Sequence, residues 1–156
     1  MRSEFEAAAA AAREHLMRRA EARLPADSFH FAHFDRPEFM LRLTPPNEDE
    51  YCSLDIGMYN RDVSIAVTAE GWSLDWEYNE VPDGDALAYL DRWFTSVVEG
   101  SIVLLSRTVP LGLWTRQERA LVDASSSTVL MLVSAADDFD PTHAAVERQY
   151  RPYPHP

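Results

Sequence analysis

The 156-residue chain carries 14 basic and 26 acidic side chains, a net charge of −12, and 46% of its residues are hydrophobic. This composition is typical of a folded globular protein, and the length predicts one domain, residues 1–156. The negative charge disfavours binding to nucleic-acid phosphates and anionic lipid, and favours a basic protein partner. Because no run of 18 apolar residues and no signal-peptide core occurs, we expect a cytoplasmic protein that does not bind a membrane.

Residues 3–24 are predicted to form a helix. Ser3 and Glu6 have capping-box spacing, six consecutive alanines favour helix, and Pro25 ends the segment. The apolar stripe is mostly alanine and buries little area, so we expect this helix at the side of the domain, as a packing helix or an interaction helix. The stripe comprises Phe5, Ala9, Ala12, Leu16 and Ala20.

The stretch from Tyr51 to Tyr78 alternates apolar and polar residues in three runs. Period two places one set of side chains on a buried face and the other on a wet face, so we predict a three-stranded antiparallel meander. Turns at Tyr59-Asn60-Arg61 and Glu70-Gly71 separate the runs. The inner face holds Leu54, Ile56, Met58, Val63, Ile65, Val67, Ala69, Trp72, Leu74, Trp76 and Tyr78, together with the single cysteine, Cys52, which we interpret as a buried apolar residue.

Two earlier strands, at 28–34 and 39–43, precede the meander, and a helix at 85–98, capped by Asp83 or Asp85, follows it. Strands are expected near 102–105 and 129–133. Residues 113–122 fit a strand or a helix, and we favour the strand. A short helix at 142–150 and a frayed tail at 150–156 complete the prediction. The fold class is therefore α+β: an antiparallel meander sheet of about five to seven strands, with helix 85–98 on its inner face and the N-terminal helix at the side.

Motifs for catalysis are missing from the sequence: it has no phosphate-binding loop, dinucleotide fingerprint, zinc-helix motif or nucleophile elbow. We therefore expect no catalytic residues, no cofactor and no metal. The wet face of the meander carries carboxylates, which could act as acid and base only in an enclosed site.

We interpret these carboxylates instead as a surface for a basic protein, although a merely solubilising face fits the same residues. The predicted partner-binding residues are Asp55, Asp62, Asp75 and Glu77, with Tyr59 and the loop residues Glu48, Asp49 and Glu50 at the rim.

One segment also resembles a known family. The run Asp83-Gly84-Asp85-Ala86-Leu87-Ala88-Tyr89-Leu90-Asp91-Arg92-Trp93-Phe94, followed by Glu99-Gly100-Ser101-Ile102-Val103, resembles immunity proteins of bacterial polymorphic-toxin loci, over roughly residues 51–105. The resemblance implies a cytoplasmic, stoichiometric inhibitor that binds its cognate secreted toxin, often by masking a basic nuclease site.

Two alternatives remain open. The order of elements also resembles type III secretion chaperones, which are dimers that hold an effector in extended form. The third possibility is a small hydrolase or ligand-binding domain with a pocket under the aromatic face of the meander.

Overall fold

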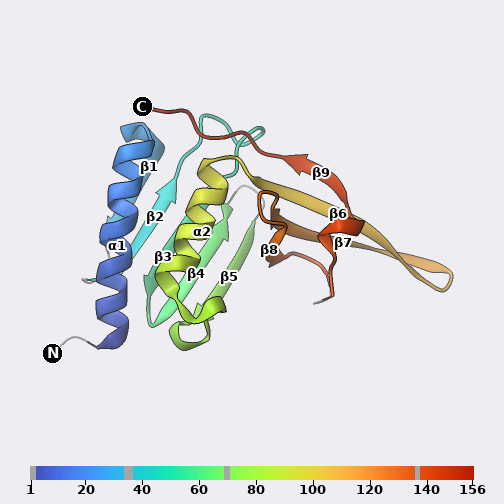
Figure 1. The fold of residues 1–156 in the computed structure, drawn as a ribbon, viewed down its shortest axis with the longest axis horizontal. Coiled ribbons are helices and arrows are strands. Elements are labelled where there is room, and N and C mark those ends of the chain that lie inside the picture. Colours follow the sequence, from blue (N-terminus) through green and yellow to red (C-terminus); the bar gives the residue numbers. More distant parts are fainter. Residues whose placement is uncertain (1–2, 34–36, 69–70, 136–137) are drawn as a thin grey trace.

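The chain adopts an α+β fold in a computed structural model that describes residues 3–33, 37–68, 71–135 and 138–156. Two helices and two antiparallel sheets make up the described part (Figure 1). Phe34 of the first predicted strand, Ala69 of the predicted inner face and Glu70 of the second turn lie outside the described residues, as does the side chain of Asp83, one of the two proposed helix caps.

The larger sheet is a five-stranded meander, as predicted, and its strands follow one another in the order β1-β2-β3-β4-β5. Its strands alternate apolar and polar residues, and the inward-facing apolar residues of β3 and β4 are almost completely buried. The burial of this apolar face stabilises the sheet. The tight turn between β3 and β4 places Asn60 and Arg61 at φ 52° and 66°, as a two-residue type I′ turn requires. The strands are β1 (Phe29–His33), β2 (Phe39–Leu43), β3 (Leu54–Tyr59), β4 (Asp62–Val67) and β5 (Trp72–Glu77).

Both helices lie side by side on one face of this sheet (Figure 1). α1 (Glu4–Arg23) begins at Ser3, whose side chain accepts a hydrogen bond from the Glu6 amide at 3.1 Å. All five residues of its predicted stripe are buried, which confirms the stripe. Because four of them are small or of moderate size, α1 can lie close to the sheet and to α2.

α2 (Ala86–Val98) carries the larger apolar face and holds the middle of the core. Asp85 caps it by accepting a hydrogen bond from the Ala88 amide at 3.1 Å. Trp93 and Phe94 are fully buried between the helices and the inner face of the sheet. Short 3₁₀ turns at Ala26–Ser28, Tyr78–Glu80 and Pro82–Gly84 connect the elements of this half of the chain.

A second sheet of four strands, in the order β8-β7-β6-β9, follows α2. The segment 113–122 is a strand, as favoured, but the predicted helix at 142–150 is wrong. A 3₁₀ turn at Pro141–His143 leads there into a strand that pairs with β6. The strands are β6 (Ile102–Leu111), β7 (Trp114–Asp123), β8 (Thr128–Leu132) and β9 (Ala145–Gln149).

The outer part of the β6–β7 hairpin projects away from the body (Figure 1), and we call residues 107–117 the arm. β9 pairs with β6 only over Val103–Ser106, and β8 pairs with β7 only over Ala120–Asp123. Beyond these points the hairpin is a two-stranded ribbon. Gly112, at φ 66°, occupies the first central position of its turn, where a type II′ turn favours glycine.

The C-terminal tail is anchored, so the prediction that residues 150–156 fray is wrong. Tyr153 is 1% exposed, and its hydroxyl donates a hydrogen bond to the Cys52 carbonyl at 2.6 Å. The Tyr153 amide also donates to the Val98 carbonyl, and Arg23 donates to the carbonyl of Tyr153, each at 2.8 Å. These long-range contacts close the edge of the core beside α1 and α2.

Candidate functional site

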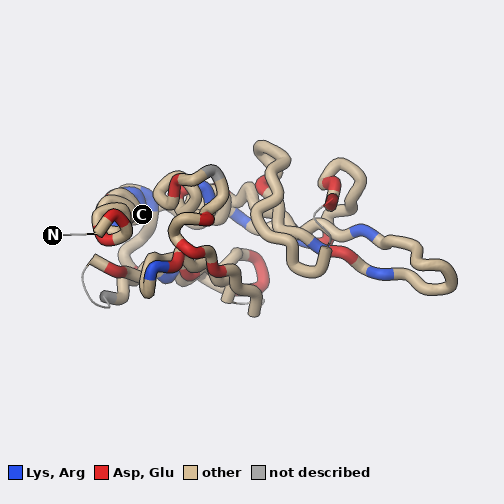
Figure 2. Tube along the Cα trace, turned by 90° about the horizontal axis from the view of Figure 1, so that it is seen from below, with Lys and Arg blue, Asp and Glu red and all other residues tan. Residues whose placement is uncertain are grey.

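Three predicted site residues gather on the outer face of the β4–β5 pair, the face opposite the helices, and we call Asp62, Asp75 and Glu77 the acidic corner. Asp62 lies directly opposite Glu77, and Ser64 lies opposite Asp75. The Ser64 hydroxyl donates to Asp75 Oδ1 at 2.5 Å. Asp75 and Glu77 are exposed and Asp62 is half-buried. Red acidic segments accordingly mark the sheet layer in Figure 2.

Tyr59 borders the acidic corner as predicted. It pairs with Asp62 across the β3–β4 turn and is half-buried. A tyrosine beside carboxylates offers a large apolar ring and a hydroxyl, which is the residue type that protein interfaces favour.

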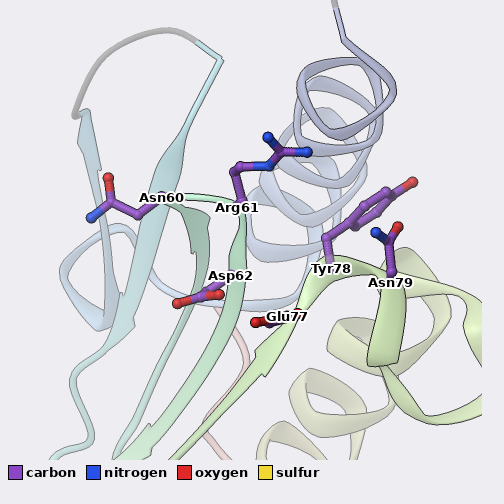
Figure 3. A pocket seen from close by; sticks show the side chains of 6 residues that line it. All are labelled: Asn60, Arg61, Asp62, Glu77, Tyr78 and Asn79. Atoms are coloured by element: carbon purple, nitrogen blue, oxygen red, sulfur yellow. The ribbon is translucent and has the colours of Figure 1, made fainter.

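No arginine compensates the charge of the acidic corner within the described residues: no ion pair joins Asp62, Asp75 or Glu77 to a cation. The nearest arginine in sequence, Arg61, points to the side of Tyr78 and α1, whereas Asp62 and Glu77 point to the other side (Figure 3). Like charges opposite each other on a sheet destabilise the fold, so this arrangement has a cost that a cationic partner would relieve.

A hollow of about 320 Å³ lies at the same end of the strands (Figure 3). It is lined by Asn60, Arg61, Asp62, Glu77, Tyr78 and Asn79. Two hydrogen bonds from backbone amides fix its walls: the Asn60 amide donates to the side-chain Oε2 of Glu38 at 2.8 Å, and the Tyr78 amide donates to the Arg61 carbonyl at 2.9 Å. The hollow therefore offers amide, guanidinium and carboxylate groups in a fixed arrangement beside the acidic corner.

The phenol of Tyr78 stays protonated at this site. Burial, and then the charges of Glu4 and Asp85, raise its pKa above the usual value. Its ring packs edge-on against Phe5, with centroids 5.6 Å apart, which ties the hollow to the start of α1. Sequence reasoning does not predict Tyr78 as a site residue, because the third alternating run ends on it and places it on the inner, apolar face.

Asp55 does not belong to the acidic corner, and the prediction that it is exposed with the others is wrong. It lies on the central strand at 8% exposure, opposite Arg42 of β2 and Ala66 of β4. Arg42 covers it, with Nε and Nη2 each 3.1 Å from a carboxylate oxygen. The side-chain hydrogen bond and charge of Asp55 raise the pKa of Arg42. This ion pair is neutral overall and stabilises the pairing of β2 with β3.

The loop holding Glu48, Asp49 and Glu50 also lies elsewhere, at the far end of β3 from Tyr59, so it does not rim the acidic corner. The six residues of β3 span about 20 Å, so the loop and Tyr59 lie that far apart along the sheet. Arg148 donates to the carbonyls of Glu48 and Asp49, and Arg151 bonds Glu50 Oε2 at 3.0 Å. The Arg151 hydrogen bond lowers the pKa of Glu50. This loop holds the C-terminal tail.

The aromatic face contains a groove instead of an enclosed pocket. It has a volume of about 290 Å³ and lies between Leu74, Trp76 and Pro82 on one side and β8 on the other. Its described lining consists of apolar and aromatic side chains. Trp76 is held by a hydrogen bond from its Nε1 to the Tyr89 hydroxyl at 2.9 Å. The groove can accept an apolar group, and its described lining has no side chain that titrates.

Sequence reasoning missed a second exposed feature, the tip of the arm. Leu113 is 100% exposed, Trp114 79% and Leu111 48%. The signal that could have identified it is the run Leu111-Gly112-Leu113-Trp114, in which apolar residues occupy the turn itself, a place where turn chemistry normally favours polar residues.

Among the described residues, no helix combines the length and apolarity needed to cross a membrane, and no three or more His, Cys, Asp or Glu side chains are grouped to hold a metal ion. Comparison of the chain with protein-family models, with curated proteins and with solved structures finds no match in any of the three.

Proposed function

We propose that this chain is a non-enzymatic immunity protein that binds and inhibits a cognate, basic, secreted bacterial toxin, and that the acidic corner is its recognition surface. The observation that carries the proposal is that Asp62 lies directly opposite Glu77, without a countercharge among the described residues, on the sheet face opposite the two helices. Asp55 on the same face is paired with Arg42, whereas the fold gains nothing by itself from the repulsion between Asp62 and Glu77.

Charge and shape both fit a protein partner. Lysine and arginine side chains of a toxin would form charge-assisted hydrogen bonds with the corner, and Tyr59 would supply an apolar contact at its edge. The net charge of −12 would attract a basic toxin from a distance and raise the association rate. The hollow lined by Asn60, Arg61 and Asn79 adds amide and guanidinium groups that can fix the register of the complex.

The test is co-expression with the protein encoded by the neighbouring gene. We expect that protein to be toxic alone and the chain to restore growth. The D75K/E77K variant should fail to restore growth. The control variant E21K/D27K makes the same change in net charge at two exposed residues away from the corner, and should protect as well as the wild type. Equal protection by both variants, or a harmless neighbouring protein, would refute the proposal.

A further inference from the structure

The arm and the apolar groove at its base together suggest how two copies of this chain associate. We infer that the protein forms a closed dimer in which the arm of each copy inserts its tip into the groove of the other copy. This inference is independent of the proposed function, because it uses neither the acidic corner nor a toxin.

The arm tip is apolar and has no contact that would shield it from water. Leu113 and Trp114 are 100% and 79% exposed, on a ribbon that extends beyond both neighbouring strands. A two-stranded ribbon in water is at best marginally stable, and its outer edges leave backbone amides and carbonyls unpaired within the described residues. A partner surface is therefore needed at the tip and along the edges.

The groove is the matching surface on the same chain. It is lined by Leu74, Trp76, Pro82 and β8, and its volume of about 290 Å³ suits a large side chain such as Trp114. β8 pairs with Ala120–Asp123, the end of β7 that is farthest from the tip. The groove therefore lies at the base of the arm, and an arm cannot reach the groove of its own chain without folding back.

Two copies satisfy this geometry by twofold symmetry. When two arms lie antiparallel, each tip reaches the base of the other arm, where the partner's groove is. The contact between a tip and a groove forms twice in this dimer. Because both tips and both grooves are then occupied, no third copy can bind in the same way. The unpaired edges of the two ribbons run alongside each other in this arrangement and can complete their backbone hydrogen bonds.

The area at the tips is compatible with a weak, reversible dimer. With aromatic side chains burying 150–250 Å², the exposed parts of Leu111, Leu113 and Trp114 amount to roughly 400 Å² per tip. Two tips would then bury roughly 800 Å², and the grooves and the adjacent ribbon edges would add to this, which places the interface at the lower end of the range for specific contacts.

Charge does not oppose a second copy as the occupant. Arg107 and Arg116 are both ion-paired with the buried Glu118, and Arg107 also with Asp138, so the arm is close to neutral. The arm of one copy can therefore approach the negatively charged body of another without like-charge repulsion.

The test is the molar mass of the full chain measured by sedimentation and light scattering over a wide concentration range. We expect a reversible dimer, and no larger species, for the wild type. The L113S/W114S variant should raise the dimer dissociation constant by about 100-fold or more, because it removes the two most exposed tip anchors. The control V146S changes an apolar residue that is 54% exposed on β9, away from the tip, and should leave the dimer intact. Circular dichroism checks that both variants are folded.

A cross-link identifies the contact itself. One preparation carries Leu113→Cys and another carries Val129→Cys, and the native Cys52 is buried at 1% exposure and does not compete. After mixing, a short bismaleimide should join Leu113→Cys of one copy to Val129→Cys of the other. A monomeric wild type, an unaffected L113S/W114S dimer, a ladder of larger oligomers, or cross-links only between two Leu113→Cys chains would each overturn the inference.

Discussion

The repulsion between Asp62 and Glu77 should be measurable in the free protein. The two carboxylates are directly opposite on β4 and β5 and have no cation beside them within the described part of the chain. Like charges at this spacing destabilise a sheet by roughly 0.2–1 kcal/mol. D62N or E77Q should therefore raise the free energy of unfolding by about 0.5 kcal/mol, and the melting temperature by about 1–2 °C for a chain of this size.

A double-mutant cycle separates this repulsion from other effects of the substitutions. Either single variant removes the whole repulsion, so the D62N/E77Q double variant should gain about the same 0.5 kcal/mol and not twice that amount. Urea unfolding would be measured at low salt and again in 1 M NaCl, where the Debye length falls to about 3 Å and the gain should disappear.

The matched control is D55N, on the same face of the same sheet. Asp55 is 8% exposed and bonded to Arg42, so removing its charge should destabilise the protein. Opposite signs for D62N and D55N are the expected result. A loss of stability in D62N at low salt, or fully additive effects in the cycle, would show that the corner is not a site of uncompensated charge.

Three further predictions concern the anchored tail and the core, and each is checked by chemical unfolding. Y153A should lower the free energy of unfolding by about 3–5 kcal/mol, because it empties a fully buried site and removes the hydrogen bond to the Cys52 carbonyl. A decrease below about 1 kcal/mol would mean that the tail is loose. G100A should destabilise clearly, since a Cβ there would lie 2.4 Å from the Pro152 nitrogen at φ 70°; unchanged stability would contradict the close contact. Burial alone would raise the pKa of Asp123, but hydrogen bonds from Ser125 and Ser96 lower it. Because the pKa is lower in the folded state, the stabilisation is complete above the unfolded value of about 3.9 and is lost as the pH falls below it. The wild type should therefore lose more stability in that acid range than D123N, and equal losses would refute the assignment.

The first half of the fold was predictable because its signals are local. Alternating residues from Leu54 to Trp76 face a core that the sequence pattern already implies, and Pro25 and Gly100 mark helix ends without reference to distant residues. The strand at 29–33 and the alanine stripe of α1 follow the same logic, since each shows one periodicity over its full length.

The C-terminal part was less predictable because its structure depends on distant partners. Residues 145–149 have no strong alternation and become a strand only by pairing with β6, across a register shift at Leu104/Leu105. The tail contains three prolines after Tyr150, a composition that predicts an extended, frayed segment. Tyr153 is nevertheless buried and hydrogen-bonded to Val98 and Cys52, and no local sequence pattern predicts these contacts. Strand β9 and the anchored tail are therefore products of tertiary contacts.

Strand register decided which site residues come together. Period two correctly placed Asp55, Asp62, Asp75 and Glu77 on the same face. Alternation along a strand could not show which residues lie opposite each other on neighbouring strands. Arg42 lies opposite Asp55 and neutralises its charge, and Asp62 lies opposite Glu77. Pairing across strands, and not alternation along one strand, defines the acidic corner.

The most direct test of the central claim is the salt dependence of the association rate between this chain and the proposed toxin partner, the protein encoded by the neighbouring gene. The wild type should associate fast at low salt, and its association rate should fall steeply as salt is added. D75K/E77K should associate far more slowly, and its rate should depend less steeply on salt. E21K/D27K, which has the same net charge as D75K/E77K, should keep a rate close to that of the wild type. If D75K/E77K and E21K/D27K have the same rates and slopes, the acidic corner is not the surface that meets the partner.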